Sequence, residues 1–413
     1  MPATKLGSAC RVSVAAAVVL SLIGCSGFTR VSPTPTSIVP PTAAPSPSFS
    51  WTPATGTRVP ASIDPTGAKD VSAALGAFID QTADGSTVVF PAGSVYRLAS
   101  FGIRLAGRHD LTFEGSGSTL LVRTPGNHDD SAAFWLSNLA TDYTSGIIIR
   151  GFTIDGGNAN TGTTSEYEGH EGASGIWTGR GTHDVEVYGV TFRNLYGHGV
   201  TLTDDSTGLW TDSVQIHDNH FLGVGTMGIA LLGASNVVIE HNVITDVGWS
   251  AIDIEPEHDS EGVADILIRS NDFIRYGWHD TSSNWWLSMV PDDGGLAARM
   301  DRITVELNSV HAGAATSNNG NYDGIGGLAI RADKTNPKTA IAIRGNWTSD
   351  SDTQDASQSV MSFANVNGLT VDGNTQPIAN GSALVACSGC TDVITSANAT
   401  SMSSPGTPAS GAP

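Results

Sequence analysis

A short segment that recurs along the sequence constrains the fold more than any other feature. Each copy alternates apolar and variable residues and then reaches a turn residue. The clearest copies end at Asn219, Asn242, Asn271, Asn308, Asn346 and Asn374. Two earlier copies, 147–151 and 185–189, carry glycine at the turn instead. Period-two alternation is typical of a strand with one buried face, and glycine, asparagine and short polar residues tolerate a left-handed turn.

A unit this short cannot bury its apolar face alone, so successive units must stack on one another. The shortest repeat runs 23 residues, from Asn219 to Asn242, which is enough for a few short strands and turns. Stacking brings the asparagines about one strand spacing apart, so their side-chain amides can hydrogen-bond along the pile. We expect a second strand in most copies, at 199–202, 228–231, 251–254 and 327–330.

Residues 70–80 precede the repeats and have the pattern of an amphipathic helix, with Asp70 as the expected N-cap. One helical face collects the apolar side chains Val71, Ala74, Leu75, Phe78 and Ile79. A stack of coils has an open apolar end, and one such helix is enough to cover it. The segment 86–98 that follows is typical of two strands joined by a tight turn.

The order of these elements resembles a known superfamily. After the helix come 88–93, with the sequence VVFPAG, then Tyr96, and then the repeating units. This order is similar to that of pectate-lyase-like proteins, over residues 64–396. The resemblance implies an all-β fold, a single-stranded right-handed parallel β-helix (a solenoid) with an N-terminal capping helix, and a polysaccharide as partner. Lyases, hydrolases, epimerases and non-catalytic proteins share this architecture, so the resemblance leaves the reaction open.

Residues 1–25 have the features of an export signal. Lys5 and Arg11 give a charged start, and 12–23 is an apolar run too short to span a membrane. The run closes with Leu-Ile-Gly-Cys, which resembles the bacterial lipobox and implies that Cys25 is lipidated. An ordinary secretory signal is the alternative. Both predict an extracellular protein, and the lipobox predicts one anchored to the bacterial cell membrane without crossing it.

Composition divides the rest of the chain. Residues 26–60 are rich in serine, threonine and proline, which predicts a semi-stiff linker. The tail, 399–413, repeats that composition and is expected to be disordered, which leaves 61–398 for the β-helix domain. For Cys387 and Cys390 we expect a local disulfide, because the sequence offers neither a thioredoxin-like context nor further zinc ligands.

The charge balance excludes one class of partner. Aspartate and glutamate number 40 against 20 lysines and arginines, which gives a net charge of −20. Nucleic-acid binding needs a basic stripe, and none is visible in the sequence. A polyanionic substrate is also disfavoured unless a cation or a local group of arginines compensates.

Stacking also sorts the residues of the second strand into columns. Ile252 and Ile254 are expected to point into the core, so Asp253 and Glu255 both point outward. The expected columns are Thr201, Ala230, Asp253 and Ala329 in one, and Thr203, Leu232, Glu255 and Arg331 in the other. Alternate residues of a strand lie about 6.5–7 Å apart, which overlaps the spacing of an acid–base carboxylate pair spanning a water in inverting glycoside hydrolysis. Asp253 and Glu255 are therefore our main catalytic candidates.

Further ionisable side chains follow the second strand in two coils, Asp204 and Asp205 in one and Glu257, His258 and Asp259 in the other. Crowded carboxylates raise one another's pKa, which keeps one acid protonated near neutrality. Asp204, Asp205 and His258 are thus catalytic candidates as well. The alternative is a solvated acidic face or a Ca²⁺ site that bridges turns, and no other cofactor is expected.

His198 lies in a Gly-His-Gly segment, 197–199, which resembles the motif of polygalacturonase-like hydrolases. In that family a pair of aspartates precedes the motif, whereas Asp204 and Asp205 follow it here. The Asn-Thr-Asp and Arg-Ile-Lys motifs of the family are missing as well. The family's active site is therefore not transferred, and His198 is either a participant in catalysis or a turn residue.

Two insertions are expected to flank this surface and to bind substrate. The first, 158–172, contributes Glu168 and His170 and precedes a strand with Trp177, after which comes Arg180. The second concentrates tryptophans in polar sequence, which favours an exposed platform for sugar rings over a core position. Its candidates are Trp278, His279, Trp285 and Trp286.

Three hypotheses follow for the function. The favoured one is an enzyme that hydrolyses an extracellular polysaccharide, with one of Asp253 and Glu255 as general acid and the other activating water. The second is β-elimination or uronate epimerisation, which needs cations near the uronate; lysines are few here, but arginines such as Arg331 keep it open. The third is a non-catalytic glycan-binding protein tethered to the cell surface.

Overall fold

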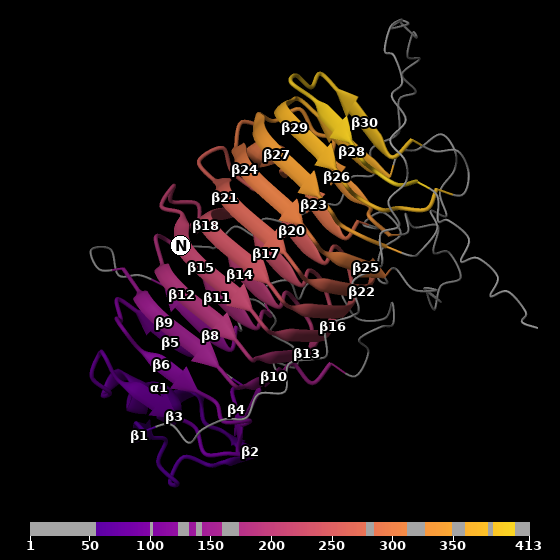
Figure 1. Ribbon diagram of the computed structural model, residues 1–413. Helices are drawn as coiled ribbons and strands as arrows, with labels where there is room; N and C mark the ends of the chain where they lie inside the picture. The colour runs from indigo at the N-terminus through magenta and orange to yellow at the C-terminus, as the bar shows by residue number, and fades with distance from the viewer. Residues whose placement is uncertain are drawn as a thin grey trace, which may run out of the picture. The chain divides into compact units, whose positions relative to one another are not determined.

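The strands of this protein form three parallel sheets that pass through successive coils (Figure 1). The computed structural model describes residues 55–99, 102–122, 132–137, 143–158, 173–277, 285–311, 327–348, 360–378 and 383–400. All of them belong to one compact unit, residues 43–413. Within the described residues, sheet A has 12 strands, sheet B has 9 and sheet C has 10.

Most strands are short, and each sheet contains strands from successive coils of the described chain. Sheet A contains β1 (Thr57–Arg58), β3 (Thr87–Val89), β6 (Thr112–Glu114), β9 (Ser145–Arg150), β12 (His183–Tyr188), β15 (Thr211–His217), β18 (Gly233–Glu240), β21 (Gly262–Arg269), β24 (Arg299–Glu306), β27 (Lys338–Arg344), β29 (Val366–Asp372) and β31 (Ile394–Ser396). Sheet B contains β2 (Thr66–Asp70), β4 (Val95–Arg97), β7 (Thr119–Leu121), β10 (Thr153–Asp155), β13 (Thr191–Leu195), β16 (His220–Val224), β19 (Val243–Val247), β22 (Asp272–Tyr276) and β25 (Ser309–His311). Sheet C contains β5 (Ile103–Ala106), β8 (Phe134–Ser137), β11 (Ile176–Thr178), β14 (Val200–Leu202), β17 (Ile229–Leu231), β20 (Ile252–Ile254), β23 (Leu287–Met289), β26 (Ile330–Ala332), β28 (Met361–Ala364) and β30 (Val385–Ser388).

One coil consists of a strand of sheet A, then one of sheet B and one of sheet C. Thus β15, β16 and β17 form one coil, and β18, β19 and β20 form the next. Each strand pairs in parallel with its counterpart in the following coil, as Val214 does with Val237 and Phe221 with Ile244. The parallel β-helix expected from the repeats is confirmed, and the strands of sheet B supply a third strand that the repeat pattern did not specify.

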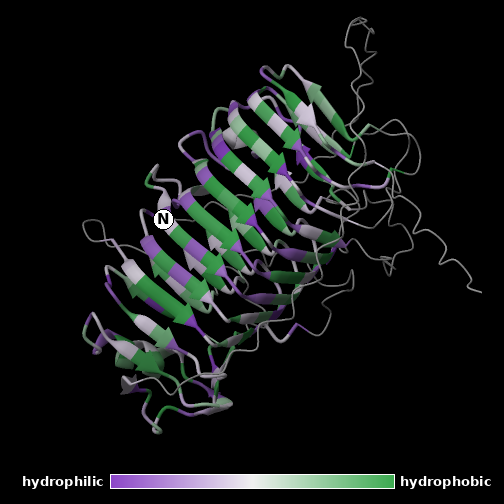
Figure 2. Cartoon of the chain, viewed as in Figure 1, coloured by the Kyte–Doolittle hydropathy of each residue, from purple (hydrophilic) through white to green (hydrophobic). Residues whose placement is uncertain are grey.

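The period-two pattern places alternate side chains inside the coils. Along β15, Val214 and Ile216 are buried, whereas Gln215 between them is exposed. Figure 2 shows hydrophobic and hydrophilic residues alternating along the strands in the same way. Aromatic rings of adjacent coils stack, and the rings of Phe192 and Phe221 lie 4.6 Å apart, nearly parallel. Burying one such side chain contributes about 1.5–3 kcal/mol, so the core is the main source of stability.

The asparagines form the expected ladder at the turn between sheets A and B. The side-chain nitrogen of Asn219 donates to Oδ1 of Asn242 at 3.0 Å, and the backbone nitrogen of Asn219 donates to the same oxygen. The same two bonds join each later pair down to Asn374 and Asn398. Asn398 extends the ladder by one rung beyond the predicted series.

The left-handed residue of each turn stands one position before the asparagine. Asp218 has φ 54°, and the corresponding residues His241 and Leu307 have φ 54° and 56°. Sheet A pairs Tyr188 with His217, so Gly189 corresponds to Asp218 and not to Asn219. The prediction that glycine replaces asparagine in the early copies is therefore wrong, because glycine fills the left-handed position and the asparagine position is apolar there.

Helix α1 (Ser72–Asp80) lies at the N-terminal coil, where the pattern placed it. Leu75 and Ile79 are fully buried and belong to the core. The N-cap is Val71, one residue later than predicted, and Asp70 instead accepts hydrogen bonds from the backbone and hydroxyl of Ser72. Ala74 is exposed, contrary to expectation, because the nine-residue helix turns only a narrow face inward.

The predicted strand pair after the helix is confirmed as β3 and β4. The first strand, β1, already lies within the stretch assigned to the linker. The short 3-10 helix η1 (Asp293–Gly295) follows β23.

Sheet C corrects one predicted register. The sequence predicts a strand at 327–330, which by analogy with β17 would begin at Leu328. The observed strand β26 begins two residues later, at Ile330, and Ala329 is buried in the core. The prediction missed β23, which pairs Ser288 with both Asp253 and Arg331. Arg331 therefore shares a column with Asp253 instead of Glu255. The apolar run 328–330 concealed where the strand begins, because all three of its residues are buried.

The last coil contains the disulfide between Cys387 and Cys390 that the sequence predicted. Cys387 pairs with Phe363 of the preceding coil, and Cys390 packs against the core. Val393, just before β31, is 42% exposed because no further described coil stacks on this end. The one α-helix in the described part of the chain has nine residues, and nothing there meets the length and hydropathy of a membrane-spanning helix.

Candidate active site

A pair of carboxyl groups lies at the end of β20 on the outer face of sheet C. Ile252 and Ile254 point into the core and are fully buried, so Asp253 and Glu255 point outward, as predicted. Asp253 is nevertheless only 5% exposed, and Glu255 is half-buried. The two border a small pocket of about 110 Å³. The pocket is lined by Met227, Trp249, Ser250, Asp253, Glu255, Trp285, Ser288, Val290 and Arg331.

The two carboxyl groups interact with each other. Hydrogen bonding with Ser288 and Glu255 lowers the pKa of Asp253, and hydrogen bonding with Asp253 raises the pKa of Glu255. The water-spanning separation expected of the pair stays a prediction. Oδ1 of Asp253 is buried and has no hydrogen-bond partner among the described residues.

Burial raises the pKa of both Asp253 and Glu255. The negative charges of Asp253 and Asp292 raise the pKa of Glu255 further, whereas Arg331 draws the pKa of Asp253 down. Two adjacent carboxyl groups out of water cannot both ionise easily, so the pair retains one proton near neutral pH. Glu255 is the side chain that holds it.

The surroundings of the pair differ on its two sides. In the column of Asp253, Ser288 comes in the next coil and Arg331 in the one after that. Arg331 is the only cation among the described residues of the pocket, and its Nε also donates to Asp333 at 3.1 Å. In the preceding coil, Ala230 lies next to Asp253 and belongs to a small outer apolar cluster with Met227, Leu232 and Trp249.

The two tryptophans before β23 have different positions. Trp286 is fully buried, and its ring centroid lies 4.8 Å from that of Phe273. The prediction that Trp286 is exposed is therefore wrong, because the residue packs into the core despite the polar sequence before it. Trp285 is half-buried, packs against the core and lines the carboxyl pocket. Trp278 and His279, as well as Glu168 and His170, lie outside the described residues.

His198 does not line the pocket. Its Nδ1 is 2.7 Å from the hydroxyl oxygen of Thr226, and the residue is 9% exposed. Burial lowers the pKa of His198 to about 4, so the ring is neutral at physiological pH. These contacts match the structural alternative, a satisfied residue of the turn before β14.

Asp204 holds its own turn together. One of its carboxylate oxygens accepts the backbone N–H of Ser206 at 2.7 Å, and the other accepts that of Gly208 at 2.6 Å. The carboxylate of Glu261, a residue that the sequence did not single out, accepts the backbone N–H groups of Glu257 and His258. Burial and the adjacent Asp204 raise the pKa of Glu261. Neither carboxyl group lines the pocket.

Two further candidates surround this turn. The side chain of His258 is 52% exposed, and its Nδ1 lies 3.5 Å from Glu261. Asp205 is exposed and accepts a hydrogen bond from the indole of Trp177 at 3.4 Å. These residues gather about the turns after sheet C, next to the carboxyl pocket in sequence but not among its lining residues.

Trp177 belongs to a stack of flat side chains on the outer face of sheet C. Its ring lies 5.4 Å from that of Trp135, with 21° between the planes, and the guanidinium of Arg104 lies 5.3 Å from the Trp135 ring. Trp177 stands in the column of Asp253, three strands earlier. Arg180 follows in a left-handed turn conformation, with φ 47°, and its Nε is buried without a partner among the described residues.

Residues 93–310 match a protein family described as "Right handed beta helix region". The match spans more than half of the chain, and the coils show the same architecture. The chain belongs to the right-handed β-helix family. This also gives the hand of the solenoid. The sequence matches no curated protein.

Solved right-handed β-helix structures resemble the chain in fold. The surface protein and adhesin PfbA of Streptococcus pneumoniae is 14% identical, with a TM-score of 0.55, over 83% of this chain and 97% of that one. The endo-xylogalacturonan hydrolase of Aspergillus tubingensis is 12% identical, with a TM-score of 0.57, over 82% and 98%. At this identity the likeness concerns the fold alone, and it joins a hydrolase and an adhesin.

In this right-handed β-helix, no three histidine, cysteine or carboxylate side chains of the described residues come together as metal ligands would. The predicted Ca²⁺ site therefore stays a prediction without a location. The arrangement that the described coils do offer is a buried, proton-sharing carboxyl pair on an outer wall, with an arginine on one side and apolar side chains on the other.

Proposed function

We propose that this protein is an extracellular enzyme that cleaves glycosidic bonds of a polysaccharide at the Asp253–Glu255 pocket. One observation carries the proposal: two outward carboxyl groups with raised pKa values line one pocket, and the buried Oδ1 of Asp253 has no partner among the described residues. An unsatisfied buried acceptor costs about 1–3 kcal/mol, so its persistence is more readily explained by a function than by stability.

Hydrolysis is the reaction that we favour. Glu255 gives its proton to the glycosidic oxygen, the bond between that oxygen and the anomeric carbon breaks, and Asp253 accepts a proton from the attacking water. The sugar and the water take the place of the hydrogen bond between the two carboxyl groups. Because burial and the neighbouring carboxylates raise the pKa of Glu255, the acid remains protonated at neutral pH.

Arg331 supports β-elimination as a second candidate. Its guanidinium lies in the column of Asp253 and is the only cation of the described pocket. It would pair with the carboxylate of a uronate, whose C5 proton Asp253 then removes while Glu255 protonates the leaving oxygen. The product would contain a carbon–carbon double bond, which hydrolysis does not form.

The experiment compares Asp253→Asn and Glu255→Gln with the wild type on neutral and acidic polysaccharides. We expect release of reducing ends to fall about 10²–10⁴-fold in both variants. Asp392→Asn, which removes an exposed carboxylate of the last coil, is the matched control and retains activity. Ultraviolet absorbance of an unsaturated product separates elimination from hydrolysis.

Unchanged release by both variants would refute the proposal. Absence of release by the wild type, together with retained glycan binding, would instead support the non-catalytic alternative. We further propose that lipidation of Cys25 holds the protein at the outside of the cell, where a polysaccharide substrate is accessible.

A further inference from the structure

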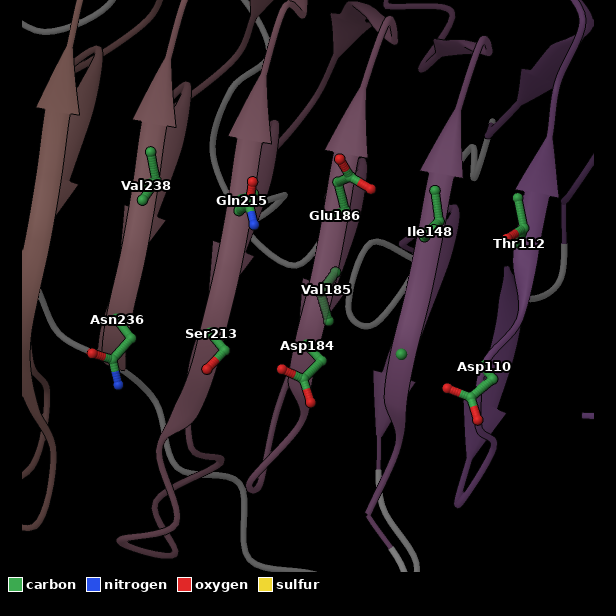
Figure 3. Close-up of a pocket in the computed structure, with 11 residues that line it drawn as sticks. Asp110, Thr112, Ile148, Asp184, Val185, Glu186, Ser213, Gln215, Asn236 and Val238 are labelled. Carbon is green, nitrogen blue, oxygen red and sulfur yellow. The ribbon is translucent and has the colours of Figure 1, made fainter. Parts of the chain in front are cut away.

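A groove of about 560 Å³ runs over the outer face of sheet A, away from the carboxyl pocket on sheet C. Its lining comes from five successive strands, β6, β9, β12, β15 and β18. Figure 3 shows the lining side chains in two rows that cross these strands. Five strands spaced at about 4.8 Å give a length of roughly 19 Å, and the volume lies within the usual range of ligand sites.

The first row consists of left-handed residues. Asp110, Gly146, Asp184, Ser213 and Asn236 occupy equivalent positions in successive coils, and their φ values lie between 53° and 65°. A left-handed residue interrupts the pleat and bends the strand at this row. At Gly146 the row has no side chain. A Cβ there would lie only 2.4 Å from Oδ1 of Asp110, so the Asp110 carboxylate occupies the space that a side chain would need.

The second row lies two residues further along each strand and forms the floor, with Ile148 and Val238 as its apolar members. Gln215 lies in this row between Glu186 and Val238. Beyond the floor stands a braced row. Arg150 donates to the hydroxyl of Tyr188 at 2.5 Å, and the Tyr188 ring stacks on His217 at 5.1 Å. These contacts hold the side of the groove in place without a ligand.

The lining chemistry selects the kind of ligand. It offers carboxylates, amides and hydroxyls, which accept from and donate to sugar hydroxyls, and apolar carbons for the C–H faces of a ring. Its described residues include no lysine, arginine or histidine, and the whole chain has a net charge of −20. His217 lies 3.1 Å from Glu186 and offsets part of the charge when it is protonated, but the lining carboxylates Asp110 and Asp184 still repel an acidic polymer and do not repel a neutral one.

We propose that this groove is a second, non-catalytic site that binds a neutral polysaccharide chain lying across the strands. The same two row positions recur in the five coils that line the groove, so a polymer of repeating sugars meets one residue of each row at every strand spacing. The inference is independent of the proposed cleavage, because the two sites lie on different sheets and share no residue.

The test blocks the floor without changing the rest of the coil. Gln215→Trp places a bulky ring at an exposed strand position, where aromatic residues are well tolerated. Thr304→Trp is the matched control, since Thr304 lies in the same row two coils beyond Val238 and outside the groove. Asp184→Asn removes a charge and keeps the shape, because asparagine accepts the left-handed conformation.

Each variant is made in the full chain that also contains Asp253→Asn, so that no probe is cleaved. Affinity electrophoresis uses laminarin, glucomannan and dextran as neutral probes, polygalacturonate and alginate as acidic probes, and chitosan as a cationic one. We expect at least one neutral probe to retard the parent protein. Gln215→Trp should raise its Kd at least 10-fold, Asp184→Asn several-fold, and Thr304→Trp should leave it unchanged.

The inference is overturned if no neutral probe binds, if only chitosan or an acidic probe binds, or if Gln215→Trp binds as tightly as Thr304→Trp. In the last case the bound glycan belongs to another surface. None of these outcomes bears on the cleavage assay of Asp253 and Glu255, so the two proposals can fail separately.

Discussion

For the single residue Asp253, the sequence predicts the direction of the side chain but not its surroundings. Its position on the outer face follows from the alternation with Ile252 and Ile254, and the sequence was sufficient to predict it. Its burial and the unpaired Oδ1 were not predictable, because they depend on Ser288 and Arg331 from later coils. The alternation pattern indicates direction, but it does not indicate what covers a side chain.

The raised pKa of Glu255 predicts a change of stability with pH. The folded state favours the protonated form, so its contribution is complete below the ordinary pKa of glutamate and is lost as the pH rises toward the raised pKa. We expect Glu255→Gln to unfold at a higher temperature than the wild type at pH 8. At pH 8 the gain is at most about 1.4 kcal/mol for each pH unit above the ordinary pKa of glutamate, because the folded state keeps its proton there.

Thermal unfolding of both proteins at pH 4 and pH 8 checks this expectation. The two curves should converge at pH 4, where the glutamate is protonated in both the folded and the unfolded state. A variant less stable than the wild type at pH 8 would contradict the assigned protonation of the pair.

Trp285 and Trp286 illustrate the limit of composition at the residue scale. Both follow the same polar insertion, and the sequence favoured exposure for both. Only Trp286 became part of the core, because it reaches Phe273 of sheet B inside the coil. Tertiary contacts of this kind leave no mark on the local sequence.

At the scale of elements, the asparagine ladder was the most predictable feature. The repeat placed six of its members in register, and the hydrogen bonds between successive coils confirm them. Asn398 was missed because its segment lies at the boundary of the presumed tail. The register of β26 was missed because a short apolar run looks the same whether it belongs to the strand or to the turn before it.

We expect an interior rung of this ladder to contribute more to the free energy of unfolding than the last rung does. Oδ1 of Asn271 accepts from the backbone and side chain of Asn242, so Asn271→Ala removes the acceptor of the buried backbone N–H of Asn242. It also removes the bonds that the Asn271 side chain donates to Ile239 and Asn308. We expect a loss of about 2–5 kcal/mol in the free energy of unfolding. Asn398→Ala is the matched comparison and should cost less, because it serves a partly buried rung at the last coil.

Urea denaturation followed by circular dichroism measures both variants. Equal losses for Asn271→Ala and Asn398→Ala would show that the ladder does not depend on burial. A loss below about 1 kcal/mol for the interior rung would show that water replaces the missing bonds.

Sheet A contains a second ladder, built on charge. Glu114 binds Arg150 at 2.7 Å, and Glu240 binds Arg269 at 2.5 Å in the same outward column. The Glu240–Arg269 pair is partly exposed and adds little stability, whereas Glu114 is buried in its pair with Arg150. Opposite charges that face each other across neighbouring strands favour the observed strand pairing.

At the scale of the whole molecule, stacking of one repeat forms two hollowed surfaces on different sheets. Sheet C carries the carboxyl pocket and sheet A carries the groove, and each surface draws its residues from several coils. Under our proposals, one sheet binds a neutral glycan while another cleaves a polysaccharide. A parallel β-helix permits this because each coil contributes one strand to every sheet.

The proposed lipid anchor belongs to this scale too. Cys25→Ser removes the thiol that would carry the lipid, so we expect the protein to move from the membrane fraction of bacterial cells to the medium or the soluble fraction. Immunoblots of fractionated cells measure the change. If the variant stays with the membranes, the segment ending at Cys25 does not act as a lipobox.

The sequence by itself determined the repeat, the inward and outward positions along the repeated strands of sheet A and along β20, the asparagine ladder and the capping helix, because all of these depend on local alternation and on a fixed period. The tertiary structure decided which outward residues become neighbours. Insertions of different length separate the copies, so the register between Asp253, Ser288 and Arg331 is set by hydrogen bonding between coils and not by distance along the chain. The pocket, the shared proton and the groove are therefore properties of the stack, whereas the strands that form them are properties of the sequence.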